Sequence, residues 1–308
     1  MNTKIIITLL SIILPGSVMA TNIGITMTSF DNPFLTILLN GMKAQAKKMP
    51  DVQLQIEDAN LDVGRQLNQV ESFIASGVDA IVVNAVDGDS TMAITQLTKE
   101  AGIPLVYVNH PPIDVDRLPK TATFIGSNEL DSGTIETREV CRLLNGKGQA
   151  VIMMGPLENH AAHTRTQDVR DVLATPECSG ITIVDNRVAN WSRTEAYDLM
   201  SNWLTEGLKF DAVIANNDEM AIGAIQALKA AQVSMDDVVI AGIDATPDGL
   251  AAMMAGELDI TVFQNATEQG AEAIRAAQKL ADGQSIPQNI WIPFELVTPE
   301  NYKQYLKH

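Results

Sequence analysis

Val78-Asp79-Ala80-Ile81-Val82-Val83-Asn84 is the stretch of this chain that best predicts its fold. A short apolar run between polar residues is typical of a strand that is buried between helices. The pattern returns 132 residues later, as Phe210-Asp211-Ala212-Val213-Ile214-Ala215-Asn216. A second pair of stretches, residues 104–109 and 239–244, repeats at an offset of 135. Two buried strands can converge on similar residues by chance, but the nearly constant offset favours a duplicated α/β half.

The rest of the chain alternates short β-branched runs with longer amphipathic segments. Strands are predicted over residues 23–27, 52–57, 80–83, 105–108, 123–125, 150–153, 181–185, 212–215, 238–243, 260–263 and 290–295. Helices are predicted over residues 34–49, 64–76, 91–101, 131–144, 165–174, 193–205, 219–231, 246–255 and 268–281. Apolar strands alternating with helices indicate parallel sheets covered on both faces, and this number of strands exceeds one ordinary open sheet. We therefore predict an α/β protein built from two doubly wound, Rossmann-like lobes.

The first twenty residues resemble an export signal. Lys4 precedes an apolar run over residues 5–14, and Val18 and Ala20 supply the small residues that precede a cleavage site. A membrane helix is the alternative, but this run is about half the roughly 20 residues that span a bilayer. Residues 1–20 are thus predicted to be a signal peptide, with the mature chain beginning near Thr21. No Cys lies at the cut, so a lipid anchor is not indicated, and we expect the protein to work outside the cytoplasm.

Composition limits the classes of partner. The 308 residues are 46% hydrophobic and carry a formal net charge of −17. Nucleic acid and anionic membranes bind basic surfaces, so an acidic chain disfavours both as partners. The acidity also has a simpler explanation, which is that net charge keeps a protein soluble.

Few residues are suited to a metal or to covalent chemistry. The two cysteines, Cys141 and Cys178, can pair in an oxidising compartment or remain two buried thiols. His160 and His163 are three residues apart but have no Cys or carboxylate ligand nearby, so a metal is not expected. The chain also lacks phosphate-loop, dinucleotide-binding, zinc-protease and serine-hydrolase motifs. We therefore predict no cofactor and no enzymatic activity.

Aromatic and polar residues follow the predicted strands at their carboxyl ends, where open α/β sheets bind ligands. Amides and carboxylates complement the hydroxyl groups of a polyol, and an aromatic face covers its C–H side. Asn and Asp are also ordinary turn and cap residues, so each one alone is weak support. The candidate ligand residues are Asp31, Asn32, Phe34, Asn109, His110, Asn159, Arg165, Trp191, Asn217, Asp244 and Gln264.

Three stretches carry a family resemblance over nearly the whole mature chain: Asn32-Pro33-Phe34, residues 217–224 and residues 242–249. With them the chain resembles the periplasmic sugar-binding proteins of the ribose/galactose type, the solute receptors of ABC importers. The resemblance implies a periplasmic binding protein fold of type I, in which two lobes joined by three crossings close on a sugar. Applied to this chain, it gives an N-terminal lobe of residues 21–127 plus 265–293 and a C-terminal lobe of residues 128–264 plus 294–308.

The resemblance also implies roles for single residues. Phe34 and Trp191 match the two aromatic walls, and Arg165 matches an arginine that forks onto sugar oxygens. The remaining hydrogen-bonding positions are matched by Asn32, Asn217, Asp244 and Gln264. The pair Asn109-His110 departs from the Asp-Arg pair of ribose receptors, and the calcium loop of galactose receptors has no counterpart.

The ligand implied is a cyclitol. Residues 30–31, 64–69, 106–109 and 190–194 resemble the branch that binds inositol or related cyclitols, including rhizopine. Ribose, galactose or allose receptors, and receptors for an autoinducer or for chemotaxis, are the alternatives, and a secreted enzyme is disfavoured. The resemblance further implies a periplasmic monomer that meets an importer's membrane permease, with a chemoreceptor as a second candidate partner, and a disulfide between Cys141 and Cys178 in the C-terminal lobe.

Overall fold

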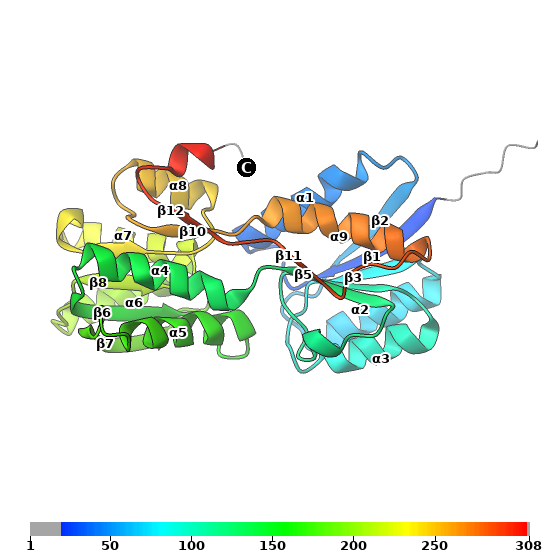
Figure 1. Ribbon diagram of the computed structural model, residues 1–308, viewed down its shortest axis with the longest axis horizontal. Coiled ribbons are helices and arrows are strands. Elements are labelled where there is room, and N and C mark those ends of the chain that lie inside the picture. Colours follow the sequence, from blue (N-terminus) through cyan, green and yellow to red (C-terminus); the bar gives the residue numbers. More distant parts are fainter. Residues whose placement is uncertain (1–19, 307–308) are drawn as a thin grey trace, which may run out of the picture.

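The computed structural model describes residues 20–306. The predicted signal peptide therefore lies outside the described residues, apart from Ala20. Two α/β lobes lie side by side along the long axis of the molecule (Figure 1). In the part that is described, no helix has the length and apolar character needed to cross a membrane.

The N-terminal lobe is a parallel sheet with strand order β11-β5-β4-β3-β1-β2. Its strands are β1 (Thr21–Met27), β2 (Val52–Asp58), β3 (Ala80–Val83), β4 (Leu105–Val108), β5 (Ala122–Gly126) and β11 (Asn289–Trp291). One face packs against α1 (Pro33–Ala46) and α9 (Ala266–Ala281), and the other against α2 (Val63–Ser76) and α3 (Thr91–Ala101). Asp62 caps the start of α2, and left-handed glycines end α2 and α3.

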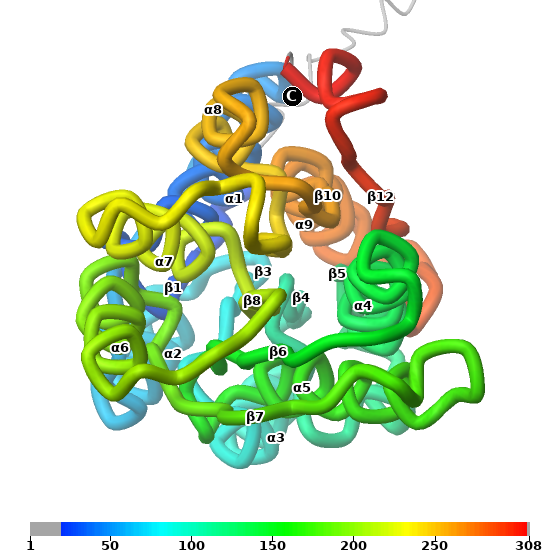
Figure 2. Tube along the Cα trace, turned by 90° about the vertical axis from the view of Figure 1, so that its left-hand side faces the viewer, coloured from blue at the N-terminus to red at the C-terminus, as the bar shows by residue number. Residues whose placement is uncertain are grey.

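The C-terminal lobe repeats this arrangement. Its main sheet has the order β7-β6-β8-β9, from β6 (Lys147–Met154), β7 (Gly180–Val188), β8 (Ala212–Ala215) and β9 (Val239–Ala241). Helices α4 (Glu129–Leu143) and α5 (His160–Leu173) cover one face, while α6 (Arg193–Thr205) and α7 (Asp218–Ala230) cover the other, with α8 (Pro247–Met254) beside α7 (Figure 2). In both lobes the second strand in sequence lies at the edge beside the first, which is the doubly wound order.

Matching side chains support the internal repeat. The carboxylate of Asp79 accepts a hydrogen bond from the backbone of Asn22 at 2.7 Å, and Asp211 does the same for Gln149, also at 2.7 Å. Asn84 and Asn216 end the two repeated stretches, and each side-chain oxygen accepts a hydrogen bond from a backbone N–H just beyond the lobe's first strand, at 3.2 Å. The echo in the sequence thus corresponds to equivalent contacts in the two lobes.

The prediction of one strand over residues 290–295 is wrong. The segment forms two short strands, because β11 pairs with β5 in the N-terminal lobe whereas β12 (Glu295–Val297) pairs with β10 (Thr261–Phe263) beside the C-terminal lobe. Pro293 lies between them and has no N–H for a continuous ladder. The chain passes between lobes here, between β5 and α4, and between β10 and α9. The lobe boundaries given above, after residues 127, 264 and 293, stay a prediction.

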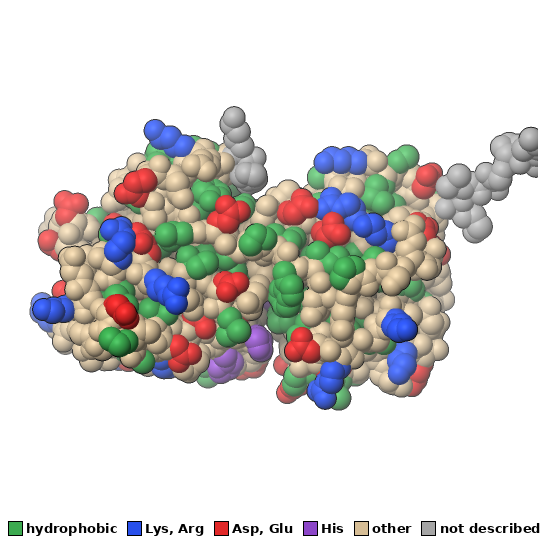
Figure 3. Space-filling model, viewed as in Figure 1, with side chains coloured by type: hydrophobic (Ala, Val, Ile, Leu, Met, Phe, Trp, Pro, Cys, Tyr) green, Lys and Arg blue, Asp and Glu red, His purple; other side chains and the backbone are tan. Residues whose placement is uncertain are grey.

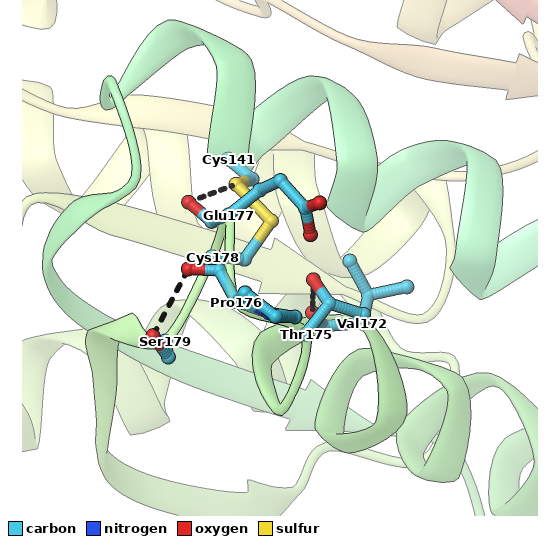
Figure 4. Close-up of a disulfide and its surroundings, with 7 residues drawn as sticks. All are labelled: Cys141, Val172, Thr175, Pro176, Glu177, Cys178 and Ser179. Carbon is cyan, nitrogen blue, oxygen red and sulfur yellow. Dashed lines mark hydrogen bonds between the residues drawn. A yellow bond between two sulfur atoms is a disulfide. The ribbon is translucent and has the colours of Figure 1, made fainter.

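Cys141 and Cys178 are joined by a disulfide in the structure, with Cα atoms 5.6 Å apart (Figure 4). Cys141 lies near the end of α4, and Cys178 lies in the loop between α5 and β7, so the bond ties the first helix of the lobe to an edge strand.

The protein purified without reductant should be two hydrogen atoms lighter than its reduced form by mass spectrometry. Because the bond closes a loop with a sequence separation of 37, replacing both cysteines by Ser should lower the free energy of unfolding by about 2–4 kcal/mol. Urea unfolding of both forms measures this loss. Two free thiols in the native protein would contradict the pairing.

Candidate functional site

Arg165 is the centre of the site in the C-terminal lobe. It lies on α5 and is only 5% exposed. Its Nε and Nη2 atoms donate to the two carboxylate oxygens of Glu129, at 2.8 and 3.3 Å, and its Nη1 donates to the backbone oxygen of Asn216 at 2.7 Å. The predicted fork of Arg165 toward a ligand is therefore occupied on one edge by Glu129.

The other edge of the guanidinium faces two predicted ligand residues. Nη2 donates to Oε1 of Gln264 at 3.3 Å, and Nη1 lies 4.0 Å from Oδ1 of Asp244. Nε2 of Gln264 is buried and has no hydrogen-bond partner within the part of the chain that is described. A buried amide donor without a partner is costly, so this group favours a ligand oxygen at that point.

Two aromatic rings lie next to Arg165. Its Cζ is 5.7 Å from the ring centroid of Trp191 and 5.9 Å from that of Phe294, distances that permit cation–π attraction. Trp191 packs so closely on Gly155 that a Cβ at Gly155 would lie 2.3 Å from its ring. Gly155 therefore sets the position of this wall, and the structure adds Phe294, which sequence reasoning missed.

Asp218 fixes the loop that carries Asp244. The backbone φ of Asp244 is 120°, a conformation that L-residues rarely adopt. The carboxylate of Asp218 accepts hydrogen bonds from the backbone N and the Oγ1 of Thr246, at 2.8 and 3.2 Å, and from Oγ1 of Thr261 at 2.7 Å. Thr261 in turn accepts a hydrogen bond from the backbone of Ala245 at 3.0 Å, so two successive N–H groups of the loop are held.

Asn109 and His110 line the N-terminal side. Asn109 has a φ of 65° and donates from Nδ2 to Oε1 of Gln269 at 3.2 Å, which leaves its own Oδ1 for a ligand. Nδ1 of His110 lies 2.7 Å from the backbone oxygen of Ala85, so it carries the proton and Nε2 is the free acceptor. Burial lowers the pKa of His110, while the Glu129 charge raises it and the Arg165 charge lowers it further. His110 of the N-terminal lobe and Glu129 and Arg165 of the C-terminal lobe are thus close enough for electrostatic interaction.

Three predicted ligand amides also serve as helix caps. The Oδ1 atoms of Asn32, Asn159 and Asn217 accept hydrogen bonds from the backbones of α1, α5 and α7. Their Nδ2 groups can donate to a ligand, and each Oδ1 keeps one lone pair beyond its capping hydrogen bond. Asn159 also starts α5 at His160, five residues before the predicted start.

The structure brings only part of the predicted set together. Arg165, Trp191, Asp244 and Gln264 form one cluster, and Phe34 joins Asp244 and Gln264 in lining a cavity of about 120 Å³ between the lobes. Asp31 is exposed, three residues before Phe34 in the chain. The space-filling view shows the seam between the lobes (Figure 3). No group of three or more His, Cys, Asp or Glu side chains within residues 20–306 is arranged to hold a metal ion.

Two doubly wound lobes with a cavity between them, lined by Phe34, Asp244 and Gln264, form the arrangement predicted for a two-lobed binding protein. A match to the periplasmic binding protein domain family covers residues 23–285, and the chain belongs to that family. The predicted family, the predicted fold class and the prediction of a binding protein rather than an enzyme are therefore confirmed.

Three relatives are informative. The chain is 58% identical to a protein of Rhizobium meliloti whose name gives rhizopine as its candidate ligand, over 93% of both chains. It is 33% identical to a xylitol-binding protein of Mycolicibacterium smegmatis, over 93% of this chain and 79% of the relative. A solute-binding protein of an ABC transporter from Bacillus halodurans, solved with bound myo-inositol, is 41% identical, with a TM-score of 0.89 over 95% of this chain and 99% of that one.

Replacing Trp191 by Ala should weaken ligand binding by on the order of 1–3 kcal/mol, because the ring is one wall beside Arg165. Isothermal titration calorimetry measures the change. Tyr197→Ala is the matched control, since Tyr197 is a part-exposed aromatic residue on α6 of the same lobe and was not among the candidate ligand residues. Unchanged affinity in the Trp191 variant would remove this residue from the site.

Burial raises the pKa of Asp218 to about 7. Between about pH 4, where an unfolded Asp titrates, and pH 7, the folded state keeps a proton that the unfolded state has released. This group therefore makes the free energy of unfolding fall as the pH rises through that window. Urea unfolding at pH 5 and pH 7.5 should show a smaller fall for Asp218→Asn than for the unmodified protein or for Asp198→Asn, a change at an exposed residue. Equal falls in all three proteins would contradict this assignment.

Proposed function

We propose that this protein is a periplasmic receptor that captures myo-inositol or a closely related cyclitol between its lobes and delivers it to the membrane permease of an ABC importer. The observation that carries the proposal is the arrangement around Gln264. An unpartnered amide donor, the edge of the Arg165 guanidinium that Glu129 does not occupy and the carboxyl group of Asp244 converge within one buried cluster. Such a set matches adjacent hydroxyl groups, which donate and accept together.

The choice of a cyclitol rests on two further points. Asn109 and His110 offer an amide oxygen and a neutral imidazole nitrogen, so this side of the site presents acceptors without a full charge. A ring with a hydroxyl on every carbon can use each of these groups. The Bacillus halodurans structure with bound myo-inositol and the Rhizobium meliloti relative support the same ligand class.

Export and partners belong to this proposal as well. Residues 1–20 would direct the chain to the periplasm, where the acidic mature protein would diffuse as a monomer. The permease is the partner that family membership supports, and a chemoreceptor is a second candidate.

Calorimetry with myo-inositol, ribose, glucose, galactose and xylitol tests the ligand. Myo-inositol should bind most tightly, and a deoxy analogue should bind roughly 5- to 150-fold more weakly if one buried group loses its partner at about 1–3 kcal/mol. Gln264→Met should weaken myo-inositol binding by a similar factor, whereas Gln284→Met, at an exposed position, should not. If ribose or galactose binds at least tenfold more tightly than myo-inositol, the assignment of a cyclitol ligand is wrong, but the assignment of the protein as a solute receptor still holds.

A further inference from the structure

Glu129 is a buried carboxylate that the strand-end pattern did not include. It is the first residue of α4, lies three residues beyond the end of β5, and is 6% exposed. Its two oxygens accept the pair of hydrogen bonds from Arg165. The hydroxyl of Ser132 donates to the backbone oxygen of Glu129 at 2.8 Å and lies 3.2 Å from Oε2. This buried acid therefore faces Arg165 directly.

The contact decides which edge of Arg165 is available. A guanidinium has five N–H groups in a rigid plane, so fixing one edge also fixes the direction of the other. Glu129 takes Nε and one Nη2 hydrogen, and the Asn216 carbonyl takes one Nη1 hydrogen. The two remaining hydrogens point to the side of Gln264 and Asp244, where the ligand is proposed to bind.

The same crossing of the chain reaches the opposite lobe. Oγ of Ser127 accepts a hydrogen bond from Nε2 of Gln269 at 3.0 Å, and Oε1 of Gln269 accepts one from Asn109 at 3.2 Å. All three side chains are buried. Since the amide of Asn109 donates one hydrogen bond to Gln269, the direction of its oxygen is fixed, and this oxygen can accept from a ligand hydroxyl.

We propose that the first crossing between the lobes, residues 127–129, positions the ligand residues on both sides of the site. Glu129 orients Arg165 in the C-terminal lobe, and Ser127 acts through Gln269 on Asn109 in the N-terminal lobe. Glu129 and Gln269 are positioning residues that do not themselves touch the ligand. The inference rests on the proposed function in taking these two residues as ligand contacts.

A double-mutant cycle tests the Glu129 half. Glu129→Gln places an amide against the guanidinium N–H groups and should weaken polyol binding about tenfold, in line with loss of a charge-assisted hydrogen bond. In an Arg165→Met background the same change should alter affinity by less than about twofold, because the residue through which it acts is gone. Glu139→Gln is the control, since Glu139 lies on the same helix and forms a comparable two-pronged pair with Arg142 at the surface.

A second cycle tests the Gln269 half. Gln269→Met should weaken binding in the unmodified protein and have little effect when Asn109 is replaced by Gly, which removes the amide yet tolerates the positive φ. The titrant is the polyol that binds the unmodified protein most tightly in the calorimetric series. If myo-inositol does not bind, this result counts against the proposed function, while both double-mutant cycles can still be measured with the polyol that does bind.

A measurement without ligand completes the test. The Nε–H resonance of Arg165, identified by its absence in Arg165→Met, should be visible by NMR because it is buried and hydrogen-bonded, and Glu129→Gln should shift it where Glu139→Gln does not. If Glu129→Gln lowers the melting temperature too far, Glu129→Asp serves instead, since it keeps the charge with a shorter reach. The proposal for Glu129 is wrong if Glu129→Gln leaves the resonance unshifted, leaves the affinity unchanged, or lowers the affinity equally with and without Arg165. The proposal for Gln269 is wrong if Gln269→Met lowers the affinity equally with and without the Asn109 side chain.

Discussion

The structure depends on one constraint: backbone groups must find hydrogen-bond partners at the carboxyl ends of the central strands, where neighbouring connections run to opposite faces of the sheet. In a doubly wound sheet the chain leaves neighbouring central strands toward opposite faces, so backbone groups at the strand ends lose their sheet partners. Asn84 supplies such partners in the N-terminal lobe, accepting a hydrogen bond from the backbone of Thr28 and donating one to the backbone of Val108. Asn216 is the equivalent residue in the C-terminal lobe, where its own backbone oxygen also receives Arg165. The requirement of the fold thus places the polar groups around which the site is built.

Much of this architecture could be predicted because buried strands are short, apolar and bounded by polar residues. The strands at residues 80–83, 105–108 and 212–215 have the bounds that the sequence predicted. The division of residues 290–295 could not be predicted, because β11 and β12 pair with strands in different lobes. The local sequence contains no signal for this change of partner. The points at which the chain passes between the lobes depend on tertiary pairing, whereas the positions of the strands follow from the local pattern of buried residues.

The site residues also fall into those that the sequence predicted and those that it did not. Arg165, Trp191, Asp244 and Gln264 were expected from strand-end positions and a family resemblance, and they lie together. The supporting residues Glu129 and Gln269 were missed. A signal for Glu129 was present, since it follows the strand at residues 122–126 as the other candidates follow theirs. No comparable signal exists for Gln269, which lies inside α9 and meets Asn109 from 160 residues away.

Electrostatics explain why a neutral ligand suits this site. Arg165 is a buried cation among several buried carboxyl groups, and burial holds the pKa values of Glu136 and Asp244 well above their usual range. The Arg165 charge opposes those rises, whereas the neighbouring charge of Asp218 adds to both of them. An anionic ligand would add a charge to a region already rich in carboxyl groups, and burying an unpaired charge is costly. A neutral polyol offers donors to Asp244 and acceptors to Gln264 and Arg165 and brings no charge of its own, so closure of the lobes need bury no additional charge.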